Sequence, residues 1–399
     1  MEKMTIQDQR TLKYNNLKMV LDIIRDNERI SRSEIARKMR MSATSATRIV
    51  SELEELYFVE DTGCYEDTKG AGRKATMIAA RAAACYCFGI SISDVEIRMR
   101  LIDFSGKLLS DRGEAQIEKN SSPEKLVEKL YEMFLVLLEK NGLQAEKIAA
   151  IGIGITGNVE PAGGTVIYGD LLQWVNVPIG DMIEKRFGIP AYVDNDVNCA
   201  LMGELSQKKY RNIDDMILLS YGRGVGSAIL SQNKIARGSV NFAGEIGHMI
   251  VDHTDGRLCY CGRRGCLTAY ISEERIIEDA RKNNPDVKTI DDIISAVQAG
   301  VPWAGILMER ICSYAAISIN NVVCMLNPPN LMLGGDLIDN YPFLFEYILN
   351  KCNAVMYGPM KPSLKFYRSE LKQDAAIIGS ALIAMDKHLE KVLREHCDI

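Results

Sequence analysis

The chain has 399 residues, of which 47% are hydrophobic and 25% are charged, and its formal net charge is −5. This length allows two or three domains, and the negative net charge excludes a uniformly basic nucleic-acid-binding protein. Neither an apolar core of signal-peptide type near the N-terminus nor a run of about 18 apolar residues is present, so we expect a cytoplasmic protein without a membrane span.

The first eighty residues have the pattern of a helix-turn-helix motif. Apolar residues recur at helical spacing in residues 15–27, and Ser31 with Glu34 forms a capping box before a second helical segment. After a short break, Ser42 is a natural N-cap for a third helical segment. Three helices, with a tight turn between the last two, predict this DNA-binding motif.

The third predicted helix begins with small hydroxyl side chains and one arginine, and has no acidic residue before Glu52. Such side chains can reach phosphates and base edges in the major groove. Two strands should follow, around a loop whose basic side chains, spaced by glycines, suit the minor groove. We expect residues 1–80 to form a winged helix-turn-helix domain that binds double-stranded operator DNA through Ser42, Thr44, Ser45, Thr47, Arg48, Lys69, Arg73 and Lys74. The alternative is a protein-interaction module whose basic side chains are only solvated.

From residue 81 onward, apolar strands alternate with amphipathic helices, which predicts α/β layers. Several of these strands run into glycine-rich loops, at 152–161, 222–226 and 327–335. Ligands commonly bind where the strands of such sheets end. The pattern therefore favours a cleft that binds a nucleotide or a sugar.

Cys259, Cys261 and Cys266 are clustered within eight positions, whereas most of the other cysteines lie singly in apolar segments. A disulfide among the three would leave one thiol over, and a reducing cytosol disfavours it. Three thiolates at this spacing favour a metal knuckle. Gly262 and Gly265 would allow the tight turns that bring the sulfur atoms together.

These motifs together resemble those of the ROK family (repressors, open reading frames and sugar kinases), in particular its repressor branch. The resemblance covers nearly the whole chain, and its motifs are GIGITGNVEP at 152–161, DNDVN at 194–198, GRGVG at 222–226, AGEIGH at 243–248, CYCGRRGC at 259–266 and NPPNLMLGG at 327–335. It implies an α/β fold in which a two-lobed, actin-like ribonuclease H-type core follows the winged helix-turn-helix domain. We expect the first lobe at 81–196, with a C-terminal helix at about 374–399 returning to it, and the second lobe at 197–373.

The resemblance also places a structural Zn²⁺ in the knuckle, with His248 as the fourth ligand beside the three cysteines. One imidazole and three thiolates form a closed tetrahedral set that leaves no position for water. The second ring nitrogen of His248 would then face the ligand in the cleft.

The sugar contacts implied by the resemblance fall on Gly157, Asn195, Asp196, Glu245, His248 and Thr268. Asp196 corresponds to the carboxylate that takes the proton from the sugar hydroxyl in the family's kinases. Thr268 departs from the family pattern, in which Glu is frequent at this position, and this puts glucose and N-acetylglucosamine in question as ligands.

Two loops also depart from the pattern of the family's kinases. The kinases have D-x-G-G-T where this chain has Ser-Ile-Ser-Asp-Val at 91–95, and G-T-G where it has Gly-Arg-Gly at 222–224. The lost carboxylate, glycines and threonine would otherwise organise Mg²⁺ and phosphate groups. We therefore expect no catalytic residue, and Asp196 would only contact the ligand.

The predicted function is that of a sugar-responsive repressor of carbohydrate genes. It would act as a homodimer or homotetramer, and its cleft would bind a sugar or a sugar phosphate. Two alternatives remain open: an active sugar kinase with a DNA-binding appendage, and a regulator tuned by a protein partner with a vestigial cleft.

Overall fold

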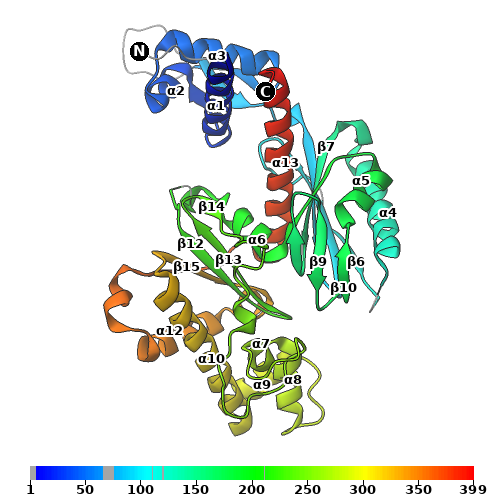
Figure 1. The fold of residues 1–399 in the computed structure, drawn as a ribbon, viewed down its shortest axis with the longest axis vertical. Coiled ribbons are helices and arrows are strands. Elements are labelled where there is room, and N and C mark those ends of the chain that lie inside the picture. The colour runs from blue at the N-terminus through cyan, green and yellow to red at the C-terminus, as the bar shows by residue number, and fades with distance from the viewer. Residues whose placement is uncertain (1–5, 66–75, 110, 119–120, 211) are drawn as a thin grey trace.

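The computed structural model describes residues 6–65, 76–109, 111–118, 121–210 and 212–399. A small domain lies at one end of the molecule, and two larger lobes, each built on a five-stranded sheet, follow it (Figure 1). This architecture confirms the predicted winged helix-turn-helix domain and two-lobed α/β core. Among the described helices, none combines the length and the apolar character that crossing a bilayer requires.

Three helices form the N-terminal domain: α1 (Ile6–Arg25), α2 (Arg32–Met39) and α3 (Ala43–Glu55). The predicted capping box is present, because Ser31 Oγ accepts a hydrogen bond from the Glu34 N–H and the Glu34 carboxylate accepts one from the Ser31 N–H. Ser42 caps α3, since its Oγ accepts from the Ser45 N–H at 3.1 Å. Local capping thus starts the second and third helices where the sequence predicts them.

A three-stranded sheet in the order β1-β3-β2 completes this domain, with β1 at Ile30–Ser31, β2 at Val59–Tyr65 and β3 at Thr76–Ala80. β2 and β3 run antiparallel, as the two strands of a wing should. The predicted basic residues of the wing tip, Lys69, Arg73 and Lys74, lie outside the described residues.

The sheet of the first lobe has the order β11-β7-β4-β5-β6. Its strands are β4 (Tyr86–Ile92), β5 (Glu96–Asp103), β6 (Gly113–Gln116), β7 (Ile148–Ile155) and β11 (Ala191–Asn195). Two helices, α4 (Pro123–Asn141) and α5 (Ile179–Phe187), cover one face, and α13 (Ala375–His396) covers the other (Figure 1). α13 lies so close that a Cβ at Gly152 would overlap the Ser380 carbonyl. The C-terminal helix therefore packs against the sheet of this lobe.

A small sheet in the order β10-β9-β8 extends from the same lobe, with β8 at Asn158–Glu160, β9 at Thr165–Gly169 and β10 at Trp174–Val177. β8 begins directly after the glycine loop that follows β7. The short hairpins of this sheet carry Tyr168 and Asp170 to the edge of the cleft.

The sheet of the second lobe has the order β14-β13-β12-β15-β16. Its strands are β12 (Met216–Tyr221), β13 (Val225–Ser231), β14 (Lys234–Ile235), β15 (Asn330–Gly334) and β16 (Lys365–Arg368). The helices of this lobe are α7 (Thr268–Ile271), α8 (Glu273–Arg281), α9 (Ile290–Gln298), α10 (Pro302–Leu326), α11 (Asp336–Asn340) and α12 (Phe343–Val355). The long helix α10 supplies much of the apolar core through side chains such as Ile311, Ile319 and Val323.

One helix, α6 (Asp196–Leu205), lies between the lobes and packs along α13. The two helices approach closely because a Cβ at Gly203 would overlap the Ala375 carbonyl, and one at Gly379 would overlap the Cys199 carbonyl. α6 begins in the cleft at Asp196, whereas α13 ends beside α1 and α3 (Figure 1). These two helices therefore join the cleft to the N-terminal domain.

Candidate ligand cleft and metal site

A polar cleft lies between the two lobes, where strands of both sheets end. The loops after β7, β11 and β12 form much of its lining, as expected for α/β sheets. The predicted sugar contacts that line it are Gly157, Asn195, Asp196, Glu245 and His248. Residues from three separate sequence motifs thus meet in one cleft.

Asn195 ends β11 and caps α6. Its Oδ1 accepts hydrogen bonds from the Val197 N–H at 2.9 Å and the Asn198 N–H at 3.1 Å, and its Nδ2 donates to the Gly157 carbonyl at 2.9 Å. One side chain therefore starts α6 and fixes the glycine loop after β7. Only one N–H of its amide is left to donate to a ligand.

Asp196 is the first residue of α6 and faces the cleft. Burial raises the pKa of its carboxyl to about 6, with smaller increases from the negative charges of Glu245 and Asp336, while the backbone N–H of Val197 opposes the shift. The group is mostly ionised at neutral pH. An ionised carboxylate in this position can accept hydrogen bonds from sugar hydroxyls.

Glu245 reaches the same space from the second lobe. Asn158 Nδ2 donates to Glu245 Oε1 at 2.7 Å, so these two side chains bridge the lobes at the floor of the cleft. The sequence-based prediction did not include Asn158. Its place directly after Gly157 in a glycine loop could have indicated a cleft residue. In the structure, the buried Asn158 amide holds the Glu245 carboxylate in position.

Four side chains come together in a metal-binding arrangement beside the cleft: His248, Cys259, Cys261 and Cys266. Their ligand atoms all lie within 4.8 Å of one another. His248 Nδ1 is 3.9 Å from Cys259 Sγ, so this ring nitrogen faces the thiols. The Sγ atoms of Cys261 and Cys266 are 3.7 Å apart, much farther than the roughly 2.05 Å of a disulfide bond. The thiols are therefore free, as the sequence predicted.

The two glycines of the knuckle have the predicted backbone role. Gly262 and Gly265 both have φ of 82°, a left-handed conformation that strains any residue with a Cβ. At Gly265 a Cβ would also overlap the Asp252 carbonyl. These turns bring Cys266 back beside Cys261.

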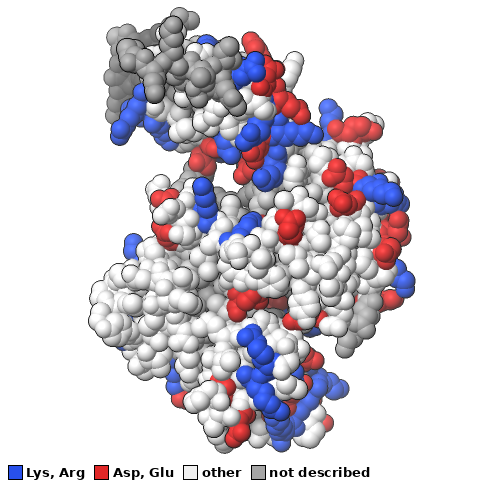
Figure 2. Space-filling view, viewed as in Figure 1, with Lys and Arg blue, Asp and Glu red and all other residues white. Residues whose placement is uncertain are grey.

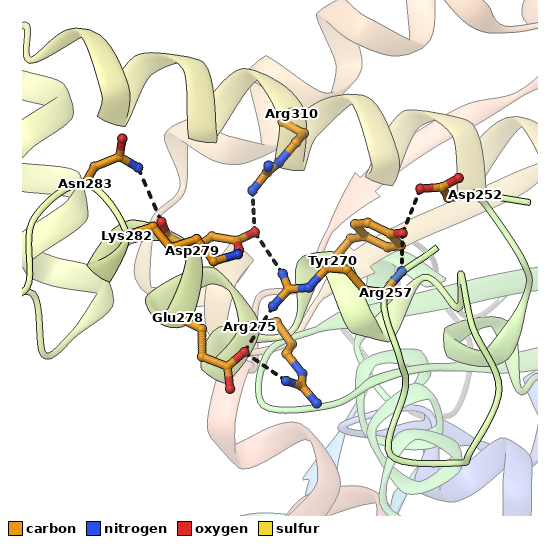
Figure 3. A network of polar contacts seen from close by, with 9 residues as sticks. All are labelled: Asp252, Arg257, Tyr270, Arg275, Glu278, Asp279, Lys282, Asn283 and Arg310. Carbon is orange, nitrogen blue, oxygen red and sulfur yellow. Dashed lines mark hydrogen bonds and ion pairs between the residues drawn. The ribbon is translucent and has the colours of Figure 1, made fainter. Parts of the chain in front are cut away.

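Residues 249–266, which we term the metal loop, are anchored to the second lobe by a network of charged side chains (Figure 3). Its centre is the buried carboxylate of Asp279 in α8, which accepts hydrogen bonds from Arg257 Nη1 at 2.8 Å and from Lys282 Nζ at 2.7 Å. Arg310 of α10 also forms an ion pair with it. The network thus ties the metal loop to two helices of the lobe.

A second branch of the network holds the backbone of the metal loop (Figure 3). The Arg257 N–H donates to Tyr270 Oη at 2.9 Å, and Tyr270 Oη donates to Asp252 Oδ2 at 2.8 Å. Glu278 accepts a further hydrogen bond from Arg257 Nη2 at 3.0 Å. The sequence does not reveal this network, because its charges lie partly in the metal loop and partly on helices whose polar faces look solvated.

The sequence profile of the ROK family matches residues 87–387, and that of a winged helix-turn-helix DNA-binding family matches residues 15–56. The chain belongs to the ROK family. It is 28% identical over 385 residues to the xylose repressor of Caldicellulosiruptor bescii, covering 92% of this chain and 94% of that one.

Solved structures show the same ROK fold. A ROK family transcriptional regulator described as a homolog of the E. coli MLC protein is similar with a TM-score of 0.80 and 22% identity, covering 97% of this chain and 99% of that one. A ROK glucokinase from Streptomyces griseus, solved with glucose and AMPPNP, is similar with a TM-score of 0.67 and 25% identity. The match covers 75% of this chain and 99% of the glucokinase.

The two loops that depart from the ROK kinase pattern meet in the structure. Arg223 Nε donates to Asp94 Oδ1 at 2.9 Å and Arg223 Nη2 donates to Asp94 Oδ2 at 2.6 Å. Both residues line the cleft, Asp94 from the β4–β5 turn of the first lobe and Arg223 from the β12–β13 turn of the second. The ion pair therefore spans the two lobes.

Thr268 lies at the start of α7, directly behind the cleft wall. It is buried, its Oγ1 donates to the Gly247 carbonyl at 2.9 Å, and it is not among the residues that line the cleft. Its hydroxyl thus supports the 3₁₀ turn Ile246–His248. Tyr260, which lies between two of the cysteines, lines the cleft and packs edge-on against the His248 ring at 5.6 Å.

The predicted DNA-contacting residues of α3 lie at its N-terminal end. Thr44, Thr47 and Arg48 are exposed, and Ser45 is partly buried beside the Ser42 hydroxyl. Thr47 Oγ1 donates to the Ala43 carbonyl at 2.9 Å. α3 therefore presents hydroxyl groups and one guanidinium on the face that does not pack into the core of the domain.

Proposed function

We propose that this ROK protein is a transcriptional repressor of carbohydrate genes, whose cleft binds a sugar and whose N-terminal domain binds operator DNA. The observation that carries the proposal is the link between these two parts. α6 begins at the cleft residue Asp196 and packs along α13, and the last turn of α13 contacts α3. The similarity to a xylose repressor over more than nine-tenths of both chains supports the same pairing of parts.

The charges of the cleft favour an uncharged sugar over a sugar phosphate. The two arginines in the lining, Arg98 and Arg223, each form an ion pair with a carboxylate. Six further acidic residues line the cleft: Asp170, Asp196, Glu204, Glu245, Asp336 and Asp339. Among the lining residues, Lys372 is the one further cation. Acidic side chains are visible at the centre of the face where the lobes meet (Figure 2). Such a field repels a phosphate group.

D-xylose is the first effector to test, because the chain is similar to a protein named for xylose. Carboxylates at Asp196 and Glu245 would accept hydrogen bonds from its hydroxyls, and Gly157 and Asn195 would shape the floor. Closure of the two lobes around the sugar would move α6 and α13. In a homodimer or homotetramer, this would change the spacing of the two DNA-binding domains and weaken operator binding.

We propose that no phosphate is transferred in the cleft. In the ROK kinases, glycines and a threonine bring the backbone close to the nucleotide phosphates. Here the Arg223 and Asp94 side chains occupy the two corresponding loops and are bound to each other. Asp196 would then serve as a hydrogen-bond acceptor and not as a base.

The knuckle would hold Zn²⁺ in a structural role. Two thiolates about 2.3 Å from a tetrahedral Zn²⁺ lie about 3.8 Å apart, and the Cys261 and Cys266 sulfur atoms are 3.7 Å apart. One nitrogen and three sulfur ligands complete the coordination, so no open position remains for catalysis. The bound metal would hold His248 and Tyr260 at the cleft.

The test is operator binding with and without sugar. Purified full-length protein is titrated onto a fluorescent DNA fragment from upstream of its own gene, with D-xylose, D-glucose, N-acetylglucosamine or their phosphates. We expect an uncharged sugar to change the operator affinity, and Glu245→Ala to abolish that change without weakening DNA binding. ATP-dependent turnover of any of these sugars that is lost in Asp196→Asn would instead support the kinase alternative.

A further inference from the structure

Asp94 and Arg223 lie in the two loops that depart from the phosphate-binding loops of ROK kinases, and their charges are opposite. Asp94 lies in the β4–β5 turn, and Arg223 lies 129 positions later in the β12–β13 turn. They form two parallel hydrogen bonds of 2.9 and 2.6 Å, and the Asp94 side chain is only 15% exposed. A bidentate pair fixes both the distance and the orientation of the two groups. Because the groups belong to different lobes, the pair fixes the distance between the lobes at this point.

Arg223 also has carboxylates of its own lobe nearby. Glu273 and Glu274 at the start of α8 both raise the pKa of the Arg223 guanidinium, after the larger contribution of its hydrogen bonds with Asp94. The Glu273 N–H donates to the Gly222 carbonyl at 3.0 Å, which holds the start of α8 against the Arg223 loop. The guanidinium is therefore bound to Asp94 of the first lobe, and two carboxylates of its own lobe are close enough for their charges to act on it.

Glu273 is in an unfavourable environment as an ionised group. Burial, with smaller contributions from the negative charges of Asp336 and Asp94, raises the pKa of its carboxyl to about 7, while Arg223 opposes the shift. A guanidinium that moved from Asp94 toward Glu273 would relieve this. Glu273 would thus gain from a pairing with the arginine that is bound to Asp94.

We propose that Arg223 and Asp94 are positioning residues that hold the two lobes in the arrangement needed for effector binding, and that Arg223 exchanges Asp94 for Glu273 and Glu274 when the cleft opens. This inference rests on the proposed sugar-binding function, because the same two lobes supply the sugar contacts. Asn158 and Glu245 bridge the floor of the cleft between the same two lobes. Breaking the Arg223–Asp94 pair would let Glu245 move away from Asp196.

The expected contribution of the Arg223–Asp94 pair to lobe closure is small enough for the effector to control the equilibrium. Partly exposed ion pairs shift equilibria only modestly, so we expect a change of about two- to five-fold in the ratio of open to closed molecules. A change of that size leaves both arrangements accessible to the sugar. A much stronger pair would hold the cleft closed whether or not the effector were present.

The experiment measures the distance between the lobes in the full-length protein. Spin labels are attached through a non-natural amino acid at two exposed positions, Lys140 in α4 and Glu346 in α12. Pulsed electron paramagnetic resonance then gives the distance distribution without sugar and with D-xylose. Asp94→Asn should increase the long-distance population by about two- to five-fold. Glu273→Gln combined with Glu274→Gln should decrease it.

The two sets of variants should change the long-distance population in opposite directions, which a general loss of packing would not do. Arg223→Met should open the cleft as Asp94→Asn does and should make the protein insensitive to the Glu273 and Glu274 changes. Glu128→Gln is the matched control, because it removes a bidentate pair with Arg186 that lies within the first lobe. An Asp94→Asn distribution that does not differ from that of the Glu128→Gln control would overturn the proposal.

Sugar binding is measured on the same variants by calorimetry with D-xylose. We expect Asp94→Asn to weaken binding by about two- to five-fold and the Glu273 and Glu274 double variant to strengthen it. If no variant binds D-xylose, the proposed effector is wrong, but the sugar-free distances still decide the role of the ion pair. If the distances respond as expected while sugar affinity does not, the pair does not position the binding residues and the proposal fails.

Discussion

His396, in the last turn of α13, lies with its Nε2 2.7 Å from the Glu52 Oε1 of α3. Lys13 of α1 forms an ion pair with the same carboxylate. Burial would raise the pKa of Glu52, but the hydrogen bonds from Lys13 and His396 lower it below its ordinary value. The carboxylate is therefore ionised and binds the C-terminal helix to the helix that carries the predicted DNA contacts. This contact is the route by which we expect a movement of α13 against the first lobe to reach α3.

We predict that His396→Ala uncouples the sugar response from DNA binding. The variant should bind D-xylose within about two-fold of the wild-type affinity, because the cleft lies at the other end of α13. The sugar-induced change in operator affinity, measured by fluorescence anisotropy, should fall by at least about half, since allosteric couplings are typically only about 1–3 kcal/mol and the His396–Glu52 contact joins α13 to α3. Lys387→Ala, on the exposed face of the same helix, is the control and should keep the full response. An unchanged response in His396→Ala would exclude this contact as the route.

We predict that Asp196→Asn stabilises the protein while abolishing sugar binding. The folded pKa of about 6 lies above the ordinary value of 3.8, so the folded state binds more protons than the unfolded state between these values. Stability is therefore lost as the pH rises through this window, and at pH 7 the buried charge costs up to about 3 kcal/mol. Removing the charge should raise the melting temperature at pH 7 but not at pH 4. Equal melting temperatures at pH 7 would contradict the assigned burial of the charge.

The same carboxyl predicts a pH dependence of effector binding. Hydrogen bonds from sugar hydroxyls need the ionised form of Asp196, so D-xylose affinity should fall as the pH decreases through about 6. Calorimetry between pH 5 and 8 measures this, and the fall should approach about ten-fold per pH unit below the pKa. A flat profile would mean that Asp196 does not accept from the sugar.

The sequence predicted the elements that depend on neighbouring residues. The capping box at Ser31, the N-cap at Ser42 and the turns at Gly262 and Gly265 are local and have the predicted geometry. The cleft residues and the fourth metal ligand, His248, came from the family resemblance, whereas the three cysteines were found by their spacing. Residues as distant as Gly157 and His248 show no sign in the sequence that they line one cleft. The cross-lobe contacts were missed for that reason. Asn158–Glu245 and Asp94–Arg223 join residues 87 and 129 positions apart, and only the fold brings them together.

We predict that removing the metal abolishes the sugar response before it abolishes DNA binding. The metal loop carries Tyr260 to the cleft beside His248, whereas the apolar side chains of the N-terminal domain pack with the first lobe and α13 and not with the metal loop. Titration with a chelator should release one Zn²⁺ per chain, measured by elemental analysis, and Cys261→Ser should bind less than one. Both should lose D-xylose binding and keep operator affinity within about three-fold, as expected for sites that share no residues. Cys324→Ser, at an exposed cysteine outside the set, is the control. Simultaneous loss of both activities would contradict the separation.

We predict that Asp279→Ala destabilises the second lobe more than Glu278→Ala does. Asp279 is 7% exposed and pairs with three cations, whereas Glu278 is 39% exposed. Removing the buried carboxylate takes from Arg310 its ion-pair partner and leaves Arg257 with Glu278 alone. Because these partners are themselves 25% and 47% exposed, we expect a cost of about 2–3 kcal/mol, below the range for a fully buried pair. Removal of Glu278 should cost about 1 kcal/mol or less.

Urea unfolding followed by tyrosine fluorescence measures both losses. The same variants connect stability to metal retention, because Arg257 anchors the metal loop through its side chain and its backbone N–H. Asp279→Ala should therefore release Zn²⁺ to a chelator faster than the wild type does, while Glu278→Ala should release it at nearly the wild-type rate. If the two variants lose Zn²⁺ equally fast, the Asp279 network stabilises the helices without holding the metal loop.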